Sequence, residues 1–347
     1  MRAEALLLAL LAASPAAAQD VGLPVTFRSV DGARFDVRSS GVDAPRVVYE
    51  SADSDPVPEE WDTVLVQGVM PDPSVVLQVL KKGETKWETL AVHRFPEGRF
   101  WAKARAPRAP GSLRLRALDA GVRRDHSVEI FAIEVFVDLP PVREAAPAPP
   151  RGRGDPSTPR PLVHARAEWG AAPPTEPYSP DPQAWRLTLH HSAGKHTRTL
   201  AESLAEARFI QDFHQHGRGW IDIGYHFIVD PMGNILEARP EGVLGAHTLS
   251  NNSGNLGIVV LGTYHAPEND RLVPAQLEAL VALGRYLVKR YGVEPSALKG
   301  HRDYRKTDCP GDTAYVAIED LRKAFAGLKR PALPSGAPFW DGVQRAR

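Results

Sequence analysis

A proline-rich segment at residues 140–160 divides the chain. It reads PPVREAAPAPPRGRGDPSTPR and holds seven prolines in 21 residues. Proline has no backbone N–H and a fixed φ, so such a segment favours an extended spacer over a helix or a central strand. The 347-residue chain is therefore predicted to form two domains, at residues 19–139 and 161–330, with residues 331–347 as a loose tail.

The N-terminus has the pattern of an export signal. Residues 1–20 read MRAEALLLALLAASPAAAQD, in which Arg2 precedes a short apolar run and small residues follow it. This order predicts a signal peptide over residues 1–18, although a buried N-terminal helix is the alternative. We expect an exported protein, periplasmic or secreted. No later apolar run approaches the roughly 20 residues of a transmembrane helix.

The charge balance gives no support for binding nucleic acid. Lys and Arg number 42, Asp and Glu number 42, and the formal net charge is zero. Nucleic-acid-binding domains usually carry a basic excess. The sequence leaves the oligomeric state open.

Residues 19–139 are predicted to be an all-β sandwich, for which an immunoglobulin-like arrangement is one option. SLRLRALD (112–119) alternates apolar and charged residues, and HSVEIFAIEVFVD (126–138) and SVVLQVL (74–80) are rich in β-branched residues. Asp31–Gly32 and Lys82–Gly83 are turn signals. Four aromatic residues either fill the core, which is the favoured interpretation, or line a sugar-binding face: Trp61, Trp87, Phe100 and Trp101.

Residues 161–330 are predicted to be an α/β domain with a central mixed sheet and about three flanking helices. Strands are expected at 185–189, 225–230 and 256–262. A capping box at Thr199 and Glu202 opens the first helix. The second helix runs from Pro274 to near Gly292, and the third begins after a cap at Asp312.

The only cysteine, Cys309, lies eight residues after His301 in GHRDYRKTDCPG (300–311). A single cysteine cannot form an internal disulfide, so it is a free thiol, an intermolecular bridge or a metal ligand. Cys309 and His301 are ligand types that zinc accepts, and a catalytic zinc site needs a third ligand. Successive strand residues point to opposite faces, so one of His190 and His191 in LTLHHSAG would face the metal.

Five segments together resemble the family of peptidoglycan recognition proteins and type 2 N-acetylmuramoyl-L-alanine amidases, over about residues 161–326. They are RAEWGA (166–171), LHHSAG (189–194), DIGYHFIVD (222–230), GAHTLSNNSGNLGIVVLG (245–262) and GHRDYRKTDCPG (300–311). The resemblance does not reach residues 19–139. All five segments follow the proline-rich spacer, so residues 161–330 are expected to carry the whole site.

The resemblance implies a role for individual residues. It implies that zinc (Zn²⁺) is bound by His190, His301 and Cys309, and that catalysis is assisted by Tyr225 and Thr307. Position 307 is threonine in animal recognition proteins and lysine in phage lysozyme-type amidases. His247 and Asn252 would contact the muropeptide or shape a turn, and His191 and His226 would support the ligands or pack behind them.

Animal recognition proteins of this family carry a residue pair that helps to choose the third residue of the peptide stem. Pro240–Glu241 occupy the matching positions here, so the preference between diaminopimelate and lysine peptides stays open. The resemblance implies an exported zinc-dependent hydrolase that cleaves the amide between N-acetylmuramic acid and L-alanine in peptidoglycan. The alternative is a recognition protein that binds peptidoglycan without cutting it. Non-catalytic relatives usually lack the cysteine ligand, which this chain retains.

Overall fold

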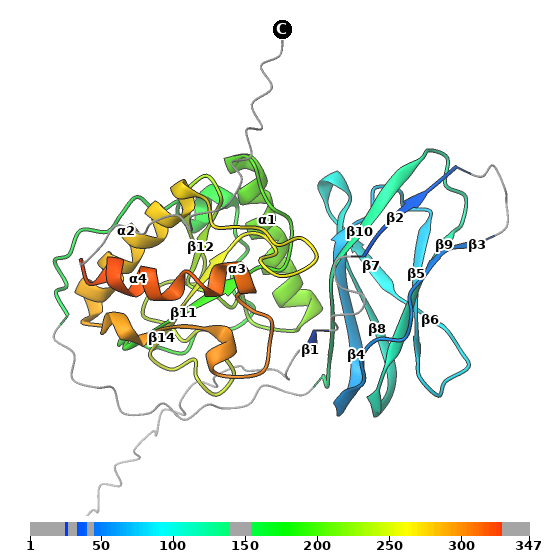
Figure 1. Cartoon of the computed structure of the whole chain (residues 1–347), viewed down its shortest axis with the longest axis horizontal. Helices are drawn as coiled ribbons and strands as arrows, with labels where there is room; N and C mark the ends of the chain where they lie inside the picture. The colour runs from blue at the N-terminus through cyan, green and yellow to red at the C-terminus, as the bar shows by residue number, and fades with distance from the viewer. Residues whose placement is uncertain (1–24, 27–32, 40–44, 139–153, 328–347) are drawn as a thin grey trace, which may run out of the picture.

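The structure, a computed structural model, describes residues 25–26, 33–39, 45–138 and 154–327. Figure 1 shows two domains side by side, a β domain and an α/β domain. The predicted signal peptide, the turn signal at Asp31–Gly32, most of the predicted spacer and the predicted tail lie outside the described residues. No helix within the described ranges is both long and apolar enough to cross a membrane.

The β domain is a two-sheet sandwich, as predicted. The strands of the first sheet, ordered β1-β10-β4-β8-β7 with β2 also on β10, are β1 (Val25–Thr26), β2 (Ala33–Val37), β4 (Val57–Val69), β7 (Ala91–Arg94), β8 (Arg99–Gly111) and β10 (His126–Phe136). Those of the second, ordered β3-β9-β5-β6, are β3 (Arg46–Glu50), β5 (Val75–Lys81), β6 (Glu88–Thr89) and β9 (Leu113–Asp119). The immunoglobulin-like arrangement stays a prediction.

The four aromatic residues do not share a face. Trp61 and Phe100 are fully buried in the sandwich core. Trp101 is buried on the opposite side of its sheet, against the α/β domain. Trp87 is half-buried, with the Arg116 guanidinium 4.1 Å from its ring centre. Core packing therefore accounts for Trp61 and Phe100, and these four residues do not form one sugar-binding face.

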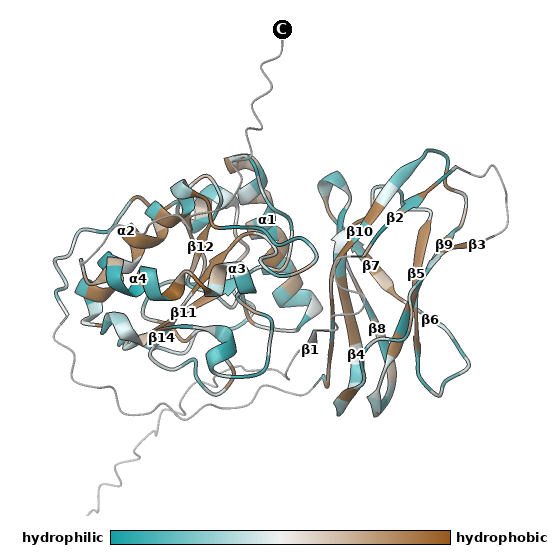
Figure 2. Ribbon diagram, viewed as in Figure 1, coloured by the Kyte–Doolittle hydropathy of each residue, from teal (hydrophilic) through white to brown (hydrophobic). Residues whose placement is uncertain are grey.

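The α/β domain contains the predicted mixed sheet, in the order β13-β12-β14-β11-β15. Its strands are β11 (Arg186–His191), β12 (Phe227–Val229), β13 (Ile235–Glu237), β14 (Asn255–Val260) and β15 (Leu298–Gly300). Strands β11, β12, β14 and β15 pair in parallel, and β13 is antiparallel to β12. Parallel strands need cover on both faces, and the central strands β12 and β14 are accordingly mostly apolar and buried (Figure 2).

Helices cover both faces of this sheet. One face packs on α2 (Pro274–Tyr291), α3 (Asp312–Tyr315) and α4 (Ile318–Phe325). The other packs on α1 (Leu200–Asp212), which continues as a π-helical turn at Phe213–Gly217. Sheet residues alternate between the two faces: Leu187 and Leu189 lie toward α2, whereas Ile228 and Val259 lie toward α1.

The predicted start of α1 and both predicted ends of α2 hold, whereas the capping box of α1 forms only in part and the third helix differs from the prediction. The Thr199 hydroxyl accepts from the Glu202 N–H at 3.2 Å, but the Glu202 carboxylate accepts from the Arg198 N–H, one residue earlier than a capping box requires. The third helix is broken into α3 and α4, and Gly311 occupies the cap position. Asp312 does not cap because its carboxylate pairs with Arg302 at 2.6 Å.

The α/β domain begins earlier than predicted. Residues 154–160, assigned to the spacer by composition, already pack against it. The Asp155 N–H donates to the Lys289 carbonyl at 2.9 Å, and Arg160 pairs with Glu237 at 3.0 Å. A Cβ on Gly154 would lie 2.2 Å from the Arg290 carbonyl oxygen, so this position needs glycine.

The first sheet of the β domain is buried on both faces. Its inner face fills the sandwich core. Its outer face carries Leu65 and Gln67 of β4, Arg99, Trp101 and Lys103 of β8, and Glu134 and Phe136 of β10, and it lies against α1 and the π-helical turn (Figure 1). The Trp101 indole N–H donates to Asp212 at 2.8 Å, and the Lys103 ammonium donates to the Gly217 carbonyl at 3.0 Å.

A buried ion pair joins the domains at the centre of this contact. The Arg99 guanidinium donates to both oxygens of Glu206, at 3.0 and 2.7 Å, and both side chains are almost completely buried. Arg99 also donates to the Gly68 carbonyl and the Gln67 amide oxygen, and its guanidinium lies 3.6 Å from the centre of the Phe209 ring. Bidentate geometry with every guanidinium nitrogen hydrogen-bonded is the form in which a buried ion pair is stable.

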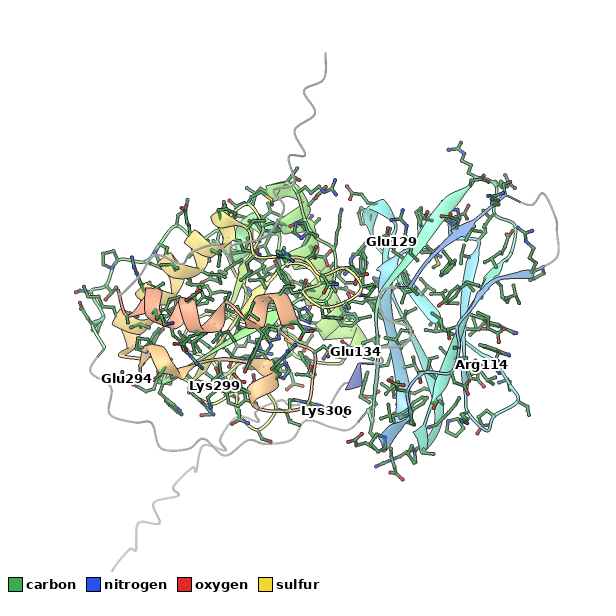
Figure 3. All side chains as sticks on the ribbon, in the orientation of Figure 1. Arg114, Glu129, Glu134, Glu294, Lys299 and Lys306 are labelled. Atoms are coloured by element: carbon green, nitrogen blue, oxygen red, sulfur yellow. The ribbon has the colours of Figure 1, made fainter. Side chains whose placement is uncertain are left out.

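We predict that Arg99→Met destabilises the full-length protein by about 3–5 kcal/mol, because Glu206 loses its cation while remaining buried. The matched control is Arg114→Met, since Arg114 pairs with Glu50 at 2.8 Å on the exposed side of the same domain (Figure 3). The control substitution should lower the free energy of unfolding by less than about 1 kcal/mol. Urea unfolding measures both. Equal midpoints for the two variants would contradict the prediction.

Candidate metal centre

A cavity opens where the α/β domain meets the β domain. Its empty volume is about 1020 Å³, including the open space at its mouth. The α/β domain supplies most of the wall, and the β domain supplies two of the lining residues, Gln67 and Glu134. The expectation that residues 161–330 carry the whole site is therefore incomplete.

His190, His301 and Cys309 converge in this cavity. One potential ligand atom from each residue lies within 4.8 Å of the others. Strand pairing brings the two histidines together: Leu189 of β11 aligns with Gly300 of β15, so His190 and His301 are the next residues on two parallel neighbours. Their rings lie 4.7 Å apart, and the Cys309 sulfur lies 3.4 Å from His190 Nδ1.

Hydrogen bonds fix which nitrogen of His190 faces the cysteine. The Asn255 carbonyl can only accept, so His247 Nε2, 2.9 Å away, must donate to it. His247 Nδ1 is then an acceptor in the neutral ring, and it lies 3.0 Å from His190 Nε2. The Thr248 hydroxyl also lies 3.0 Å from His247 Nδ1. With its proton on Nε2 and shared with His247, His190 directs the lone pair of Nδ1 toward Cys309, as a metal ligand would.

The other two ligands are equally suited to a cation. His301 Nε2 is buried and has no hydrogen-bond partner among the described residues. Burial, with Arg305 next, lowers the pKa of His301 to about 3, and burial, with His301 next, lowers that of His190. Both imidazoles are thus neutral, as ligation requires. Burial raises the pKa of the Cys309 thiol to about 12, and only a bound cation would turn this group into a thiolate ligand at neutral pH.

This donor set fits a catalytic zinc site. Two imidazole nitrogens and one sulfur are standard zinc ligands, and all three residues border the cavity that a substrate could enter. No further histidine, cysteine or carboxylate joins this three-residue cluster within the described part of the chain.

Tyr225 and Thr307 border the same cavity, as expected from the sequence. The Tyr225 ring centre lies 5.1 Å from that of His190. Burial, followed by the nearby Cys309, raises the pKa of Tyr225, so its hydroxyl keeps its proton and can donate. The Thr307 hydroxyl oxygen accepts from the Cys309 N–H at 3.3 Å, which leaves its own proton to donate.

The remaining predicted site residues have supporting positions. His191 points away from His190, and its Nδ1 accepts from the Tyr264 N–H at 3.3 Å. His226 Nε2 donates to the Val243 carbonyl, and its Nδ1 accepts from the Gly257 N–H. The Asn252 side-chain oxygen accepts from the backbone N–H groups of His247 and Thr248, so it shapes the loop that holds His247.

Of the two predicted substrate contacts, His247 borders the cavity and Asn252 does not. The His247 ring is hydrogen-bonded to His190. Glu241, at the position of the family's stem-selecting pair, instead accepts from the Tyr291 hydroxyl at 2.9 Å and pairs with Arg160. It is not among the residues that line the cavity.

Among the cavity residues that sequence reasoning missed are His214, Arg218 and Glu134. His214 lies in the π-helical turn, and its Nδ1 accepts from the Gly224 N–H at 3.0 Å, with its ring 5.5 Å from Tyr225. Arg218 follows the same turn, and Glu134 comes from β10. The available signal for Glu134 is a single carboxylate in the otherwise apolar run IFAIEVF (130–136), which indicates that a second partner covers this part of the strand.

Comparisons with known proteins identify similar sequences for the α/β domain. The sequence model of the family described as N-acetylmuramoyl-L-alanine amidase matches residues 180–312. Peptidoglycan-recognition protein SC2 of Drosophila simulans is 34% identical over 157 residues, which cover 45% of this chain and 84% of that protein. The human N-acetylmuramoyl-L-alanine amidase is 36% identical over 184 residues, which cover 50% of this chain and 30% of that protein.

Solved structures of similar proteins cover a similar share of the chain. Wild-type Drosophila PGRP-LB is 31% identical, with a TM-score of 0.41, over 46% of this chain and 92% of its own. The amidase LysC of Clostridium intestinale is 29% identical, with a TM-score of 0.41, over 49% of this chain and 99% of its own.

The family model spans His190, His301 and Cys309, and the match to a relative at 34% identity covers 84% of that relative. The chain therefore belongs to the family of peptidoglycan-recognition proteins and N-acetylmuramoyl-L-alanine amidases.

Proposed function

We propose that the protein is an exported zinc-dependent amidase that hydrolyses the bond between N-acetylmuramic acid and L-alanine in peptidoglycan. The observation that carries the proposal is the cluster of His190, His301 and Cys309 beside the Tyr225 ring. Bound there, zinc would polarise the scissile carbonyl and acidify the attacking water. Export rests on the N-terminal sequence alone.

The side chains around the candidate metal ligands would each have a different role in the reaction. The Tyr225 hydroxyl, held protonated, donates a hydrogen bond where negative charge develops on the carbonyl oxygen. Thr307, anchored by the Cys309 N–H, supplies a second hydroxyl at the cavity wall. Phe209, Ile210 and Phe213 line the cavity toward the β domain and limit access of bulk water.

The second candidate function is peptidoglycan recognition without cleavage. The names of several relatives favour it, SC2 of Drosophila simulans among them. The full ligand set favours the enzyme, because binding alone would need neither Cys309 nor its approach to His190 Nδ1.

Digestion of purified sacculi separates the two functions. We expect the protein to release new L-alanine amino termini, to stop when a chelator is added, and to recover when zinc is restored. Binding of sacculi without new termini, with zinc present, would support the recognition function instead.

We predict that the protein binds about one zinc ion and that Cys309→Ser weakens binding strongly, because a neutral hydroxyl replaces a thiolate. Metal analysis after reconstitution and dialysis measures this. His216→Asn is the matched control, since His216 is an exposed histidine of the same domain. The ligand assignment is wrong if Cys309→Ser retains zinc as tightly as the control.

We predict that His247→Leu lowers zinc affinity by about 10- to 100-fold, because His190 loses the acceptor that orients its ring. Competition with a zinc-binding dye measures the affinity. A variant that binds zinc normally but loses muropeptide affinity would return His247 to the role of substrate contact.

We predict that Tyr225→Phe lowers kcat by about 100- to 1000-fold and leaves zinc content and muropeptide affinity nearly unchanged, because it removes only a donor to the developing charge. Thr307→Ala should act in the same direction, more mildly. Tyr291→Phe is the control, because that hydroxyl binds Glu241 outside the cavity. Undiminished turnover in Tyr225→Phe would remove the proposed role and leave the enzyme assignment intact.

A further inference from the structure

Glu134 is an acidic residue in the buried second half of β10, where its neighbours Ile133, Val135 and Phe136 are apolar. It belongs to the β domain, yet it lines the cavity that holds the candidate metal ligands. Its side chain is 10% exposed, and Figure 3 shows it at the boundary between the domains. One carboxylate oxygen accepts from Arg218 of the α/β domain, whose side chain is 12% exposed.

A β-bulge aims Glu134 at the α/β domain. The pairing of β10 with β4 shifts register between Ile130 and Ala132. Val128 and Ile130 point into the sandwich core before the shift, and Ile133 and Val135 do so after it. Glu134 consequently lies on the outer face, level with Leu65. Bulges often redirect side chains next to functional sites.

A row of three residues on neighbouring strands of the β domain contacts the segment next to Arg218. Lys103, Leu65 and Glu134 align across β8, β4 and β10. Lys103 donates to the Gly217 carbonyl, and a Cβ on Gly217 would lie 3.3 Å from Leu65. Arg218 itself lies over the Trp220 ring, 4.8 Å from its centre. These contacts with the β domain position the Arg218 side chain in the cavity.

The pair is left with one unused donor and one unused acceptor. Glu134 Oε2 and Arg218 Nε are both buried, and neither has a hydrogen-bond partner among the described residues. A buried, unpaired polar atom is costly, and such atoms commonly await a ligand or an ordered water. A secondary amide offers the complementary pair, an N–H to donate and a carbonyl oxygen to accept.

We propose that Glu134 and Arg218 form a substrate-binding subsite to which the β domain contributes, and that it binds a secondary amide of the muropeptide, in the peptide stem or in the N-acetyl group. The proposal rests on the proposed function of the same cavity. It gives the β domain a part in substrate binding, beyond that of an appended module.

The test uses the full-length, zinc-loaded protein and a soluble muramyl-tripeptide. Glu134→Gln should raise KM about tenfold, the loss expected for a hydrogen bond to a charged group, while kcat stays within about twofold. Arg218→Met should do the same. The double variant should raise KM no more than the worse single variant does, because the two side chains act as a unit.

The control is Glu129→Gln on the same strand, because Glu129 does not line the cavity, is 35% exposed and pairs with Arg34 at 3.2 Å (Figure 3). It should leave KM and kcat unchanged. If either single variant fails to fold, the double variant carries the test, since it leaves no unpaired buried ion. A wild-type KM in a variant that is merely less stable would overturn the proposal, because the pair would then be structural only.

The two sources of the amide are separated by repeating the assay with the de-N-acetylated substrate. If Glu134→Gln no longer raises KM on this substrate, the bound amide is that of the N-acetyl group. If the rise in KM is undiminished, the bound amide lies in the peptide stem. If the wild type cleaves nothing, the amidase proposal fails. The subsite is then tested by calorimetric Kd for the same muropeptide, and an unchanged Kd in Glu134→Gln would overturn it.

Discussion

The parallel pairing of β11 with β14 and β15 is the constraint on which the rest of the site depends. Leu189 aligns with Ile258 on one side and with Gly300 on the other. This register brings His190 beside His301, although 110 residues separate them in the sequence. A shift of one residue would exchange the faces of the sheet on which His190 and His191 lie. The metal centre is thus a property of strand register.

Burial around this centre sets its chemistry. The imidazoles of His190 and His301 are kept neutral by desolvation, so their lone pairs are free for a cation. The same desolvation keeps the Tyr225 hydroxyl protonated and able to donate. A chain of hydrogen bonds from Asn255 through His247 to His190 then selects the nitrogen that faces Cys309.

The β domain shares in this burial because one of its sheets is covered on both faces. Its inner face fills the sandwich, and its outer face packs on α1 through the Arg99–Glu206 pair. Glu206 and Phe209 therefore lie buried on α1 together with Ala207 and Ile210. A helix covered on two sides has a wider buried surface than a simple amphipathic helix.

The sequence by itself determined the two-domain division, the mixed sheet, the ends of α2 and the identity of the three candidate ligands. These follow from local signals: proline density, apolar periodicity, Pro and Gly at helix ends, and a family resemblance carried by short segments. The role of His247 and the membership of Glu134 and Arg218 in the cavity were decided only by the tertiary structure. Tautomers depend on hydrogen-bond partners, and a carboxylate on β10 meets the cavity only through a bulge and a domain contact, neither of which local sequence encodes.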